Sequence, residues 1–122
     1  MNEASNRAHE LGRLGEQAAG EELTRRGFRI LGRNVRLRSA EVDLIARDAA
    51  GLVFVEVKSR STARYGEPYE AVDQAKRDRL IRAALEYIDA NALGDPDFRI
   101  GVASVLFDPS GRLQKVEWID EA

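Results

Sequence analysis

The stretch that decides the fold reads AEVDLIA at residues 40–46 and LVFVEVK at residues 52–58. Both runs are rich in β-branched and other apolar residues, which is typical of strands. The residues between them, DAAG at 48–51, form a short turn signal. The two runs therefore predict a β-hairpin. The second run is apolar on both faces, which predicts a central position in a sheet.

The loop length of this hairpin decides which charged side chains meet. A loop of two or four residues places Asp43 opposite Glu56 and Glu41 opposite Lys58, whereas an odd loop without a bulge separates the first two onto opposite faces. Like charges that oppose each other destabilise a sheet, so the even register predicts a divalent cation between Asp43 and Glu56. The simpler alternative is a solvated ion pair of Glu56 with Lys58 on a sheet surface.

The remaining elements follow from periodicity and turn signals. We expect a helix over residues 8–26, a strand over 28–37 interrupted near Gly32, a polar loop over 59–68, a helix over 72–91, a strand over 99–107 and an edge strand over 113–119. The order is α-β-β-β-α-β-β. At 122 residues, the chain 1–122 is expected to form a single α/β domain.

The composition narrows the possible functions. Hydrophobic residues make up 43% and charged residues 33% of the chain, as in ordinary soluble globular proteins. No apolar run is long enough to cross a membrane, and the first residues lack the apolar core of a signal peptide. The absence of cysteine excludes disulfides, thiol catalysis and cysteine-bound zinc. We therefore expect a cytoplasmic protein with no membrane partner.

An Asp-x(n)-Glu-x-Lys pattern across a hairpin resembles the PD-(D/E)xK nuclease core of restriction endonucleases and archaeal Holliday-junction resolvases. The whole chain is more similar to the YraN family of small, uncharacterised bacterial proteins. The matching residues are Gly12, Gly15-Glu16, Ala19, Leu23, Gly27, Ile30-Leu31, Asn34, Glu41-Val42-Asp43-Leu44-Ile45, Val53-Phe54-Val55-Glu56-Val57-Lys58, Tyr65-Gly66 and Lys76. Three positions depart from the family pattern: Ala40 replaces Gly, Arg77 replaces Gln, and Arg99-Ile100-Gly101 replaces Arg-Phe-Asp.

The resemblance implies a restriction-endonuclease-like αβββαβ core, with a mixed central sheet flanked by helices. It also implies Mg²⁺- or Mn²⁺-dependent hydrolysis of phosphodiester bonds in DNA, including branched or structured DNA. Asp43, Glu56 and the Val57 carbonyl would hold the metal, since Mg²⁺ prefers oxygen ligands. Lys58 would orient or deprotonate a water molecule, or stabilise the transition state. Glu16 would bind a second metal or orient a water.

Two arguments differ on which residue of the second helix points towards this site. The apolar face of the helix, extended backwards, favours Gln74 or Arg77 and leaves Lys76 to one side. The family resemblance points instead to Lys76. We take Gln74 as the candidate catalytic residue from this helix.

A basic segment precedes the hairpin: six arginines lie between residues 25 and 38, without an acidic residue. Arginine suits phosphate oxygens, although a solvated charged face is equally compatible with the pattern. The expected nucleic-acid contacts are Arg29, Arg33, Arg36, Arg38, Arg60, Arg64 and Tyr65. We expect DNA as the partner and allow for a homodimer. The net charge of −2 also leaves open a non-catalytic nucleic-acid-binding module, or a protein-interaction module using the acidic C-terminal part.

Overall fold

The computed structural model describes residues 3–61 and 73–120, with side chains described from residue 9 onward. Its elements are α1 (Glu3–Arg25), β1 (Arg29–Arg36), β2 (Glu41–Asp48), β3 (Gly51–Ser61), α2 (Gln74–Ala90), β4 (Phe98–Phe107) and β5 (Leu113–Asp120). The predicted order of elements is confirmed. Most boundaries differ by only a few residues, although α1 begins earlier than expected and β3 continues into the predicted polar loop.

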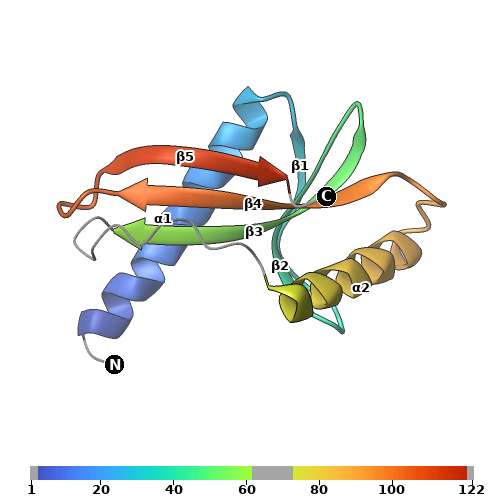
Figure 1. The fold of residues 1–122 in the computed structure, drawn as a ribbon, viewed down its shortest axis with the longest axis horizontal. Helices are drawn as coiled ribbons and strands as arrows, with labels where there is room; N and C mark the ends of the chain where they lie inside the picture. Colours follow the sequence, from blue (N-terminus) through green and yellow to red (C-terminus); the bar gives the residue numbers. More distant parts are fainter. Residues whose placement is uncertain (1–2, 62–72, 121–122) are drawn as a thin grey trace.

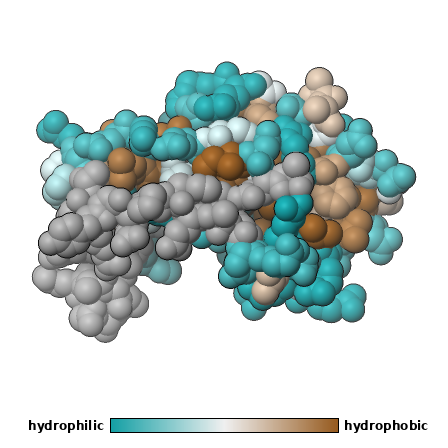
Figure 2. Space-filling model, in the orientation of Figure 1, coloured by the Kyte–Doolittle hydropathy of each residue, from teal (hydrophilic) through white to brown (hydrophobic). Residues whose placement is uncertain are grey.

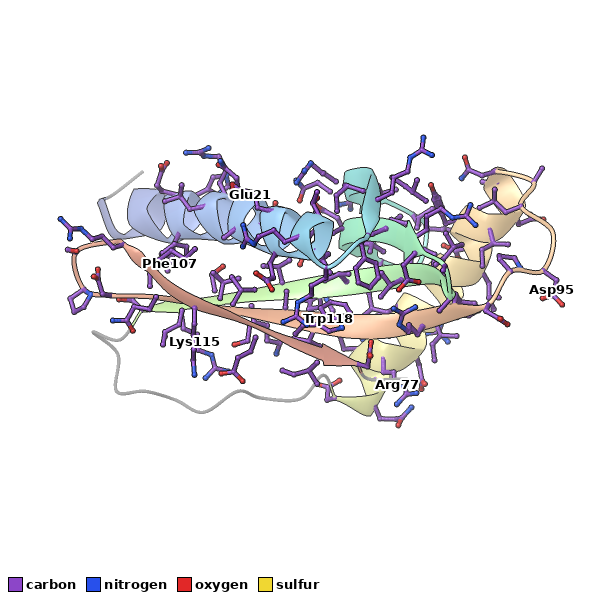
Figure 3. All side chains as sticks on the ribbon, turned by 90° about the horizontal axis from the view of Figure 1, so that it is seen from above. Glu21, Arg77, Asp95, Phe107, Lys115 and Trp118 are labelled. Atoms are coloured by element: carbon purple, nitrogen blue, oxygen red, sulfur yellow. The ribbon has the colours of Figure 1, made fainter. Side chains whose placement is uncertain are left out.

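The strands form one mixed sheet in the order β1-β2-β3-β4-β5 (Figure 1). β3 and β4 are parallel, whereas the other neighbouring strands are antiparallel. The two helices cover opposite faces of the sheet (Figure 3). This five-stranded sheet flanked by helices confirms the predicted α/β class, with β3 central and β5 at an edge, and is consistent with a restriction-endonuclease-like core.

Each face of the sheet buries its own apolar cluster against a helix. The cluster facing α1 contains Ala19, Leu23, Phe28, Leu44, Ala46, Val53, Val55, Ala103, Val105 and Phe107. The cluster facing α2 contains Val42, Ile45, Leu52, Phe54, Leu80, Ala83, Ala84, Ile88, Ile100 and Val102. The coloured surface in Figure 2 is mostly hydrophilic. Hydrophobic patches are visible in the middle and at the right of the view. Within the described residues, neither helix is long and apolar enough to cross a membrane.

The β2–β3 hairpin has the predicted even register. Pairing runs from Asp48 opposite Gly51 to Leu44 opposite Val55, around a two-residue turn at 49–50. Gly51 has φ +131°, and a Cβ there would collide with the Asp97 carbonyl, so this corner requires glycine.

The hairpin ladder then stops at Leu44 and Val55, which corrects part of the sequence-based pairing. Asp43 does not pair with Glu56, nor Glu41 with Lys58. Glu41 pairs with Arg36 on β1 instead. Side-chain alternation also breaks at this point, because Val42 packs in the cluster facing α2 while Leu44 packs in the cluster facing α1. A regular strand would place both on one face. The irregularity is centred on Asp43.

One departure from the family pattern has a packing explanation. Gly101 is buried beneath the Trp118 ring, and a Cβ at this position would collide with the indole. Trp118 in turn packs on Phe28, with ring centroids 5.9 Å apart. A large side chain on β5 therefore occupies the space that an aspartate at position 101 would need.

Candidate active site

Asp43 marks the point where β2 separates from β3. Its Oδ2 accepts a hydrogen bond of 2.8 Å from the Val57 backbone N–H. At this position a side-chain oxygen therefore replaces the backbone carbonyl that a continued β2–β3 ladder would supply. The N–H and C=O of one strand residue point to the same side. The Val57 carbonyl therefore also faces the side on which β2 has stopped pairing. The half-buried Asp43 carboxylate and this carbonyl lie at the resulting fork in the sheet.

Two charged side chains reach the fork from β3 and α2. Glu56 Oε2 lies 3.5 Å from Lys76 Nζ, and the two side chains are only 18% and 33% exposed. Asp73 caps the start of α2 by accepting a 2.8 Å hydrogen bond from the Lys76 N–H. The cap fixes the first turn of the helix and thereby the position of the Lys76 side chain.

Burial raises the pKa of the Asp43 carboxyl to about 7. The hydrogen bond from Val57 opposes this shift, because it stabilises the charged form. The carboxylates of Glu56 and Glu16 contribute to the rise in pKa, and the Lys76 ammonium opposes it. One acidic side chain from α1 and one from β3 thus act on the Asp43 carboxyl of β2.

Glu16 comes from α1, which approaches β3 very closely. Gly15 allows this approach, because a Cβ there would collide with the Ser59 side chain. Glu16 is half-buried and lines a shallow hollow between α1 and β1. The other lining residues are Arg13, Gln17, Arg33 and Asn34. Asn34 has φ +49°, a left-handed conformation that asparagine tolerates better than most residues.

Lys58 lies beyond the fork on the same face of β3 as Glu56. The parallel ladder with β4 stays regular here, pairing Glu56 with Val102 and Lys58 with Ser104. Because side chains alternate along this regular ladder, Glu56, Lys58 and Arg60 share one face. Lys58 and Arg60 are both half-buried. The predicted arrangement of Glu56 and Lys58 on one strand face is therefore present.

The helix-geometry argument for Gln74 is not supported by the observed side chains. Gln74 is exposed, and its amide donates a 2.7 Å hydrogen bond to Asp78 one turn further along the helix. Lys76 contacts Glu56 instead. Periodicity failed here because the first turn of α2 extends past the apolar cluster, so the core-facing stripe does not define what faces the fork. The family resemblance, which points to Lys76, agrees with this contact.

The predicted basic segment does not form one continuous surface. Arg25 and Arg26 are paired with Glu22 at 2.8 Å. Arg29 is aligned with Arg47 near the turn end of the hairpin, whereas Arg33 lies over Gly20 of α1. The bulge between Ile30 and Gly32 contributes to this division, since it changes the register of β1.

Two further arginines sit near α2. Arg36 lies 3.6 Å from Glu41, and Arg38 borders a hollow that also contains Glu86. Arg33 shares a hollow with Glu16, one of the candidate site residues. Arg64 and Tyr65 lie outside the described residues.

The donor set suits a hard cation. It offers the Asp43 and Glu56 carboxylates and a main-chain carbonyl, which are oxygen ligands of the kind Mg²⁺ and Mn²⁺ use together with water and phosphate. Within residues 9–61 and 73–120, no three acidic or histidine side chains converge at ligating distance. The raised pKa of Asp43 comes mainly from burial of its carboxyl, and a divalent cation would favour the charged form of this group.

The fold and these residues define the class: an α/β protein with a restriction-endonuclease-like core and an acidic cluster where its central hairpin opens. Residues 15–105 match the family described as Uncharacterised protein family UPF0102. The chain belongs to this family, which confirms the YraN-like resemblance.

Relatives in several bacteria cover most of the chain. A UPF0102 protein of Symbiobacterium thermophilum is 52% identical over 104 residues, which are 85% of this chain and 88% of the relative. A UPF0102 protein of Chlorobium phaeobacteroides is 43% identical over 118 residues, covering 93% of this chain and 94% of the relative.

Proposed function

We propose that this protein is a metal-dependent endonuclease that hydrolyses phosphodiester bonds in DNA, including branched or structured DNA. The observation that supports this most directly is the Asp43 carboxyl, which is half-buried where β2 and β3 separate and is influenced by the carboxylates of Glu56 and Glu16. Carboxyl groups with strongly raised pKa values are concentrated at functional sites. A cytoplasmic location is part of the same proposal.

Each residue has a role that follows from its position. Asp43 and Glu56 would hold Mg²⁺ or Mn²⁺ together with the Val57 carbonyl. The bound metal would supply a positive charge against the scissile phosphate and lower the pKa of a water molecule. Lys58 would place its ammonium against the same phosphate and neutralise charge that develops in the transition state. Glu16 would orient a water from the opposite side of the fork.

Substrate binding would use the cations around the fork. Arg33 in the α1–β1 hollow and Arg60 on the face of Lys58 are positioned on two sides of the acidic cluster. Phosphates of a bound strand would contact these two before the remaining arginines. The modest number of such cations fits a protein that recognises the shape of its substrate more than it binds any duplex.

A non-catalytic nucleic-acid-binding module is the second candidate. The Lys76–Glu56 ion pair favours it, because an internal ammonium already compensates part of the acidic charge. In that case the fork would be a structural ion-pair network, and only the arginines would contact nucleic acid.

The deciding experiment is cleavage of linear, single-stranded, flapped and four-way DNA in Mg²⁺ and in Mn²⁺. Asp43→Asn, Glu56→Gln and Glu16→Gln should each reduce cleavage. Glu21→Gln is the matched control, since Glu21 lies on the same helix as Glu16 but is exposed and contacts Gln17. DNA binding without cleavage in either metal would establish the second candidate instead.

A further inference from the structure

The two edges of the sheet differ in how they are protected from further pairing. β1 is interrupted by a bulge and contains Asn34 in a left-handed conformation. Both features break the regular row of backbone groups with which a further strand would pair. β5 pairs with β4 alone among the described strands and is the last strand of the sheet (Figure 1). It has no proline or glycine within Leu113–Asp120.

The charges on β5 alternate in sign on one face. Lys115 and Glu117 are two residues apart and form a 2.9 Å ion pair along the strand. Figure 3 shows Lys115 extending from the face of the sheet opposite α1. Both side chains are about half exposed, at 59% and 50%, so they are available to a neighbouring strand. Val116 lies between them and packs on the other face, against the cluster that faces α1.

We infer that β5 is a dimerisation edge at which a second copy of this chain pairs antiparallel, with the two-fold axis at Val116. This register places Lys115 opposite Glu117 of the partner copy, and the symmetry repeats that contact. The intrastrand ion pair is then extended into an alternating group of four charges. The inference does not depend on the proposed nuclease activity.

Neighbouring registers are less favourable. An axis at Glu117 would place the Glu117 side chains of the two copies opposite each other. An axis at Lys115 would do so for the two Lys115 side chains. Like charges directly opposed destabilise strand pairing. An axis between two residues would oppose side chains from different faces, which a two-fold axis perpendicular to the sheet does not allow. The Val116 register alone opposes unlike charges among these choices.

The interface would be short. A register shift between Leu106 and Phe107 leaves the regular part of β5 to the residues after Gln114. Backbone hydrogen bonds over so few residues, with two ion pairs, bury less area than a standard stable interface. We therefore expect a weak dimer that forms with rising protein concentration and weakens with added salt.

Sedimentation across micromolar to millimolar protein concentrations, with the full chain, tests the inference. Lys115→Glu and Glu117→Lys should each weaken self-association roughly tenfold or more, because two attractive contacts become repulsive. Mixing the two single variants should restore association, since the acidic β5 of one then faces the basic β5 of the other. The double variant Lys115→Glu/Glu117→Lys should also associate as the wild type does.

The matched control is Arg29→Glu, a charge reversal of an exposed residue on β1 at the other edge, which should leave association unchanged. Circular dichroism confirms that each variant folds. A wild-type protein that stays monomeric up to millimolar concentration would overturn the inference. So would single variants that dimerise as well as the wild type, or a mixture that does not associate better than either variant alone.

Discussion

The two halves of strand β3 have opposite characters. Residues 52–55 are buried, while residues 56–61 are half-buried and mostly polar. The difference lies in the neighbouring strand, because β2 pairs with the first half and stops at Leu44. Where both neighbours are present, side chains from the two faces build the core. Beyond Leu44, no described strand pairs with this edge of β3, and its side chains there are mostly polar, while the parallel ladder to β4 continues.

The largest effect is expected from breaking the first half. Phe54 packs edge-on against Tyr87 and Phe98, with ring centroids 5.8 and 5.9 Å away. Phe54→Ala should lower the free energy of unfolding by about 3–5 kcal/mol, because it leaves a cavity between the sheet and α2. Urea denaturation measures this loss. A change below about 1 kcal/mol would contradict the assignment of this half to stability.

Lys58→Ala tests the second half without affecting the first. Stability should stay nearly unchanged, whereas single-turnover cleavage should fall by roughly 10²-fold, the scale for losing a positioned charge-stabilising group. Lys58→Arg should not restore the rate fully, since a planar guanidinium is not a point charge. Equal cleavage by wild type and Lys58→Ala would remove Lys58 from the site.

The pKa of Asp43 gives the fork a pH signature. This pKa is raised from 3.8 to about 7, so the folded protein keeps a proton that the unfolded chain loses. Stability from this group is therefore lost as pH rises from about 4 to about 7, and levels off above. Asp43→Asn retains an acceptor for Val57 and should remove this dependence, so that above pH 7 it unfolds at higher urea concentration than wild type.

Metal affinity should follow the same titration. Binding of Mn²⁺ requires the deprotonated carboxylate, so calorimetry should show weak binding well below pH 7 and proton release upon binding. Asp43→Asn and Glu56→Gln should both abolish the heat of Mn²⁺ binding. Binding that is equal in wild type and both variants would place the metal elsewhere.

The smallest effect concerns the arginines. Arg33→Ala should reduce the salt dependence of DNA binding by about one unit of slope, the contribution of one phosphate contact. Arg29→Ala should change it less, because Arg29 lies near the hairpin turn, beside Arg47 and away from the fork. Equal changes in the salt slope for the two variants would show that the contribution of an arginine to DNA binding does not depend on its position along β1.

Much of the first half of β3 was predictable, because the hairpin register follows from an even loop between two apolar runs. The point at which the β2–β3 pairing ends was not predictable, because it depends on the Asp43 side chain replacing a backbone acceptor. The sequence predicted the acidic residues and Lys58, and their roles remain predictions. Helix periodicity favoured Gln74, whereas the side chain that contacts Glu56 is that of Lys76, because the first turn of α2 extends past the core and its direction is set by the Asp73 cap.

The hydrogen bond from Val57 N–H to Asp43 also makes the fork observable by spectroscopy. An amide proton bound to a carboxylate shifts its resonance when that carboxylate gains a proton or a metal ion. The chemical shift of the Val57 amide proton therefore reports on the Asp43 carboxylate, to which it is directly hydrogen-bonded. A single resolved peak would follow the ionisation of Asp43 in the intact protein, without label, substrate or turnover.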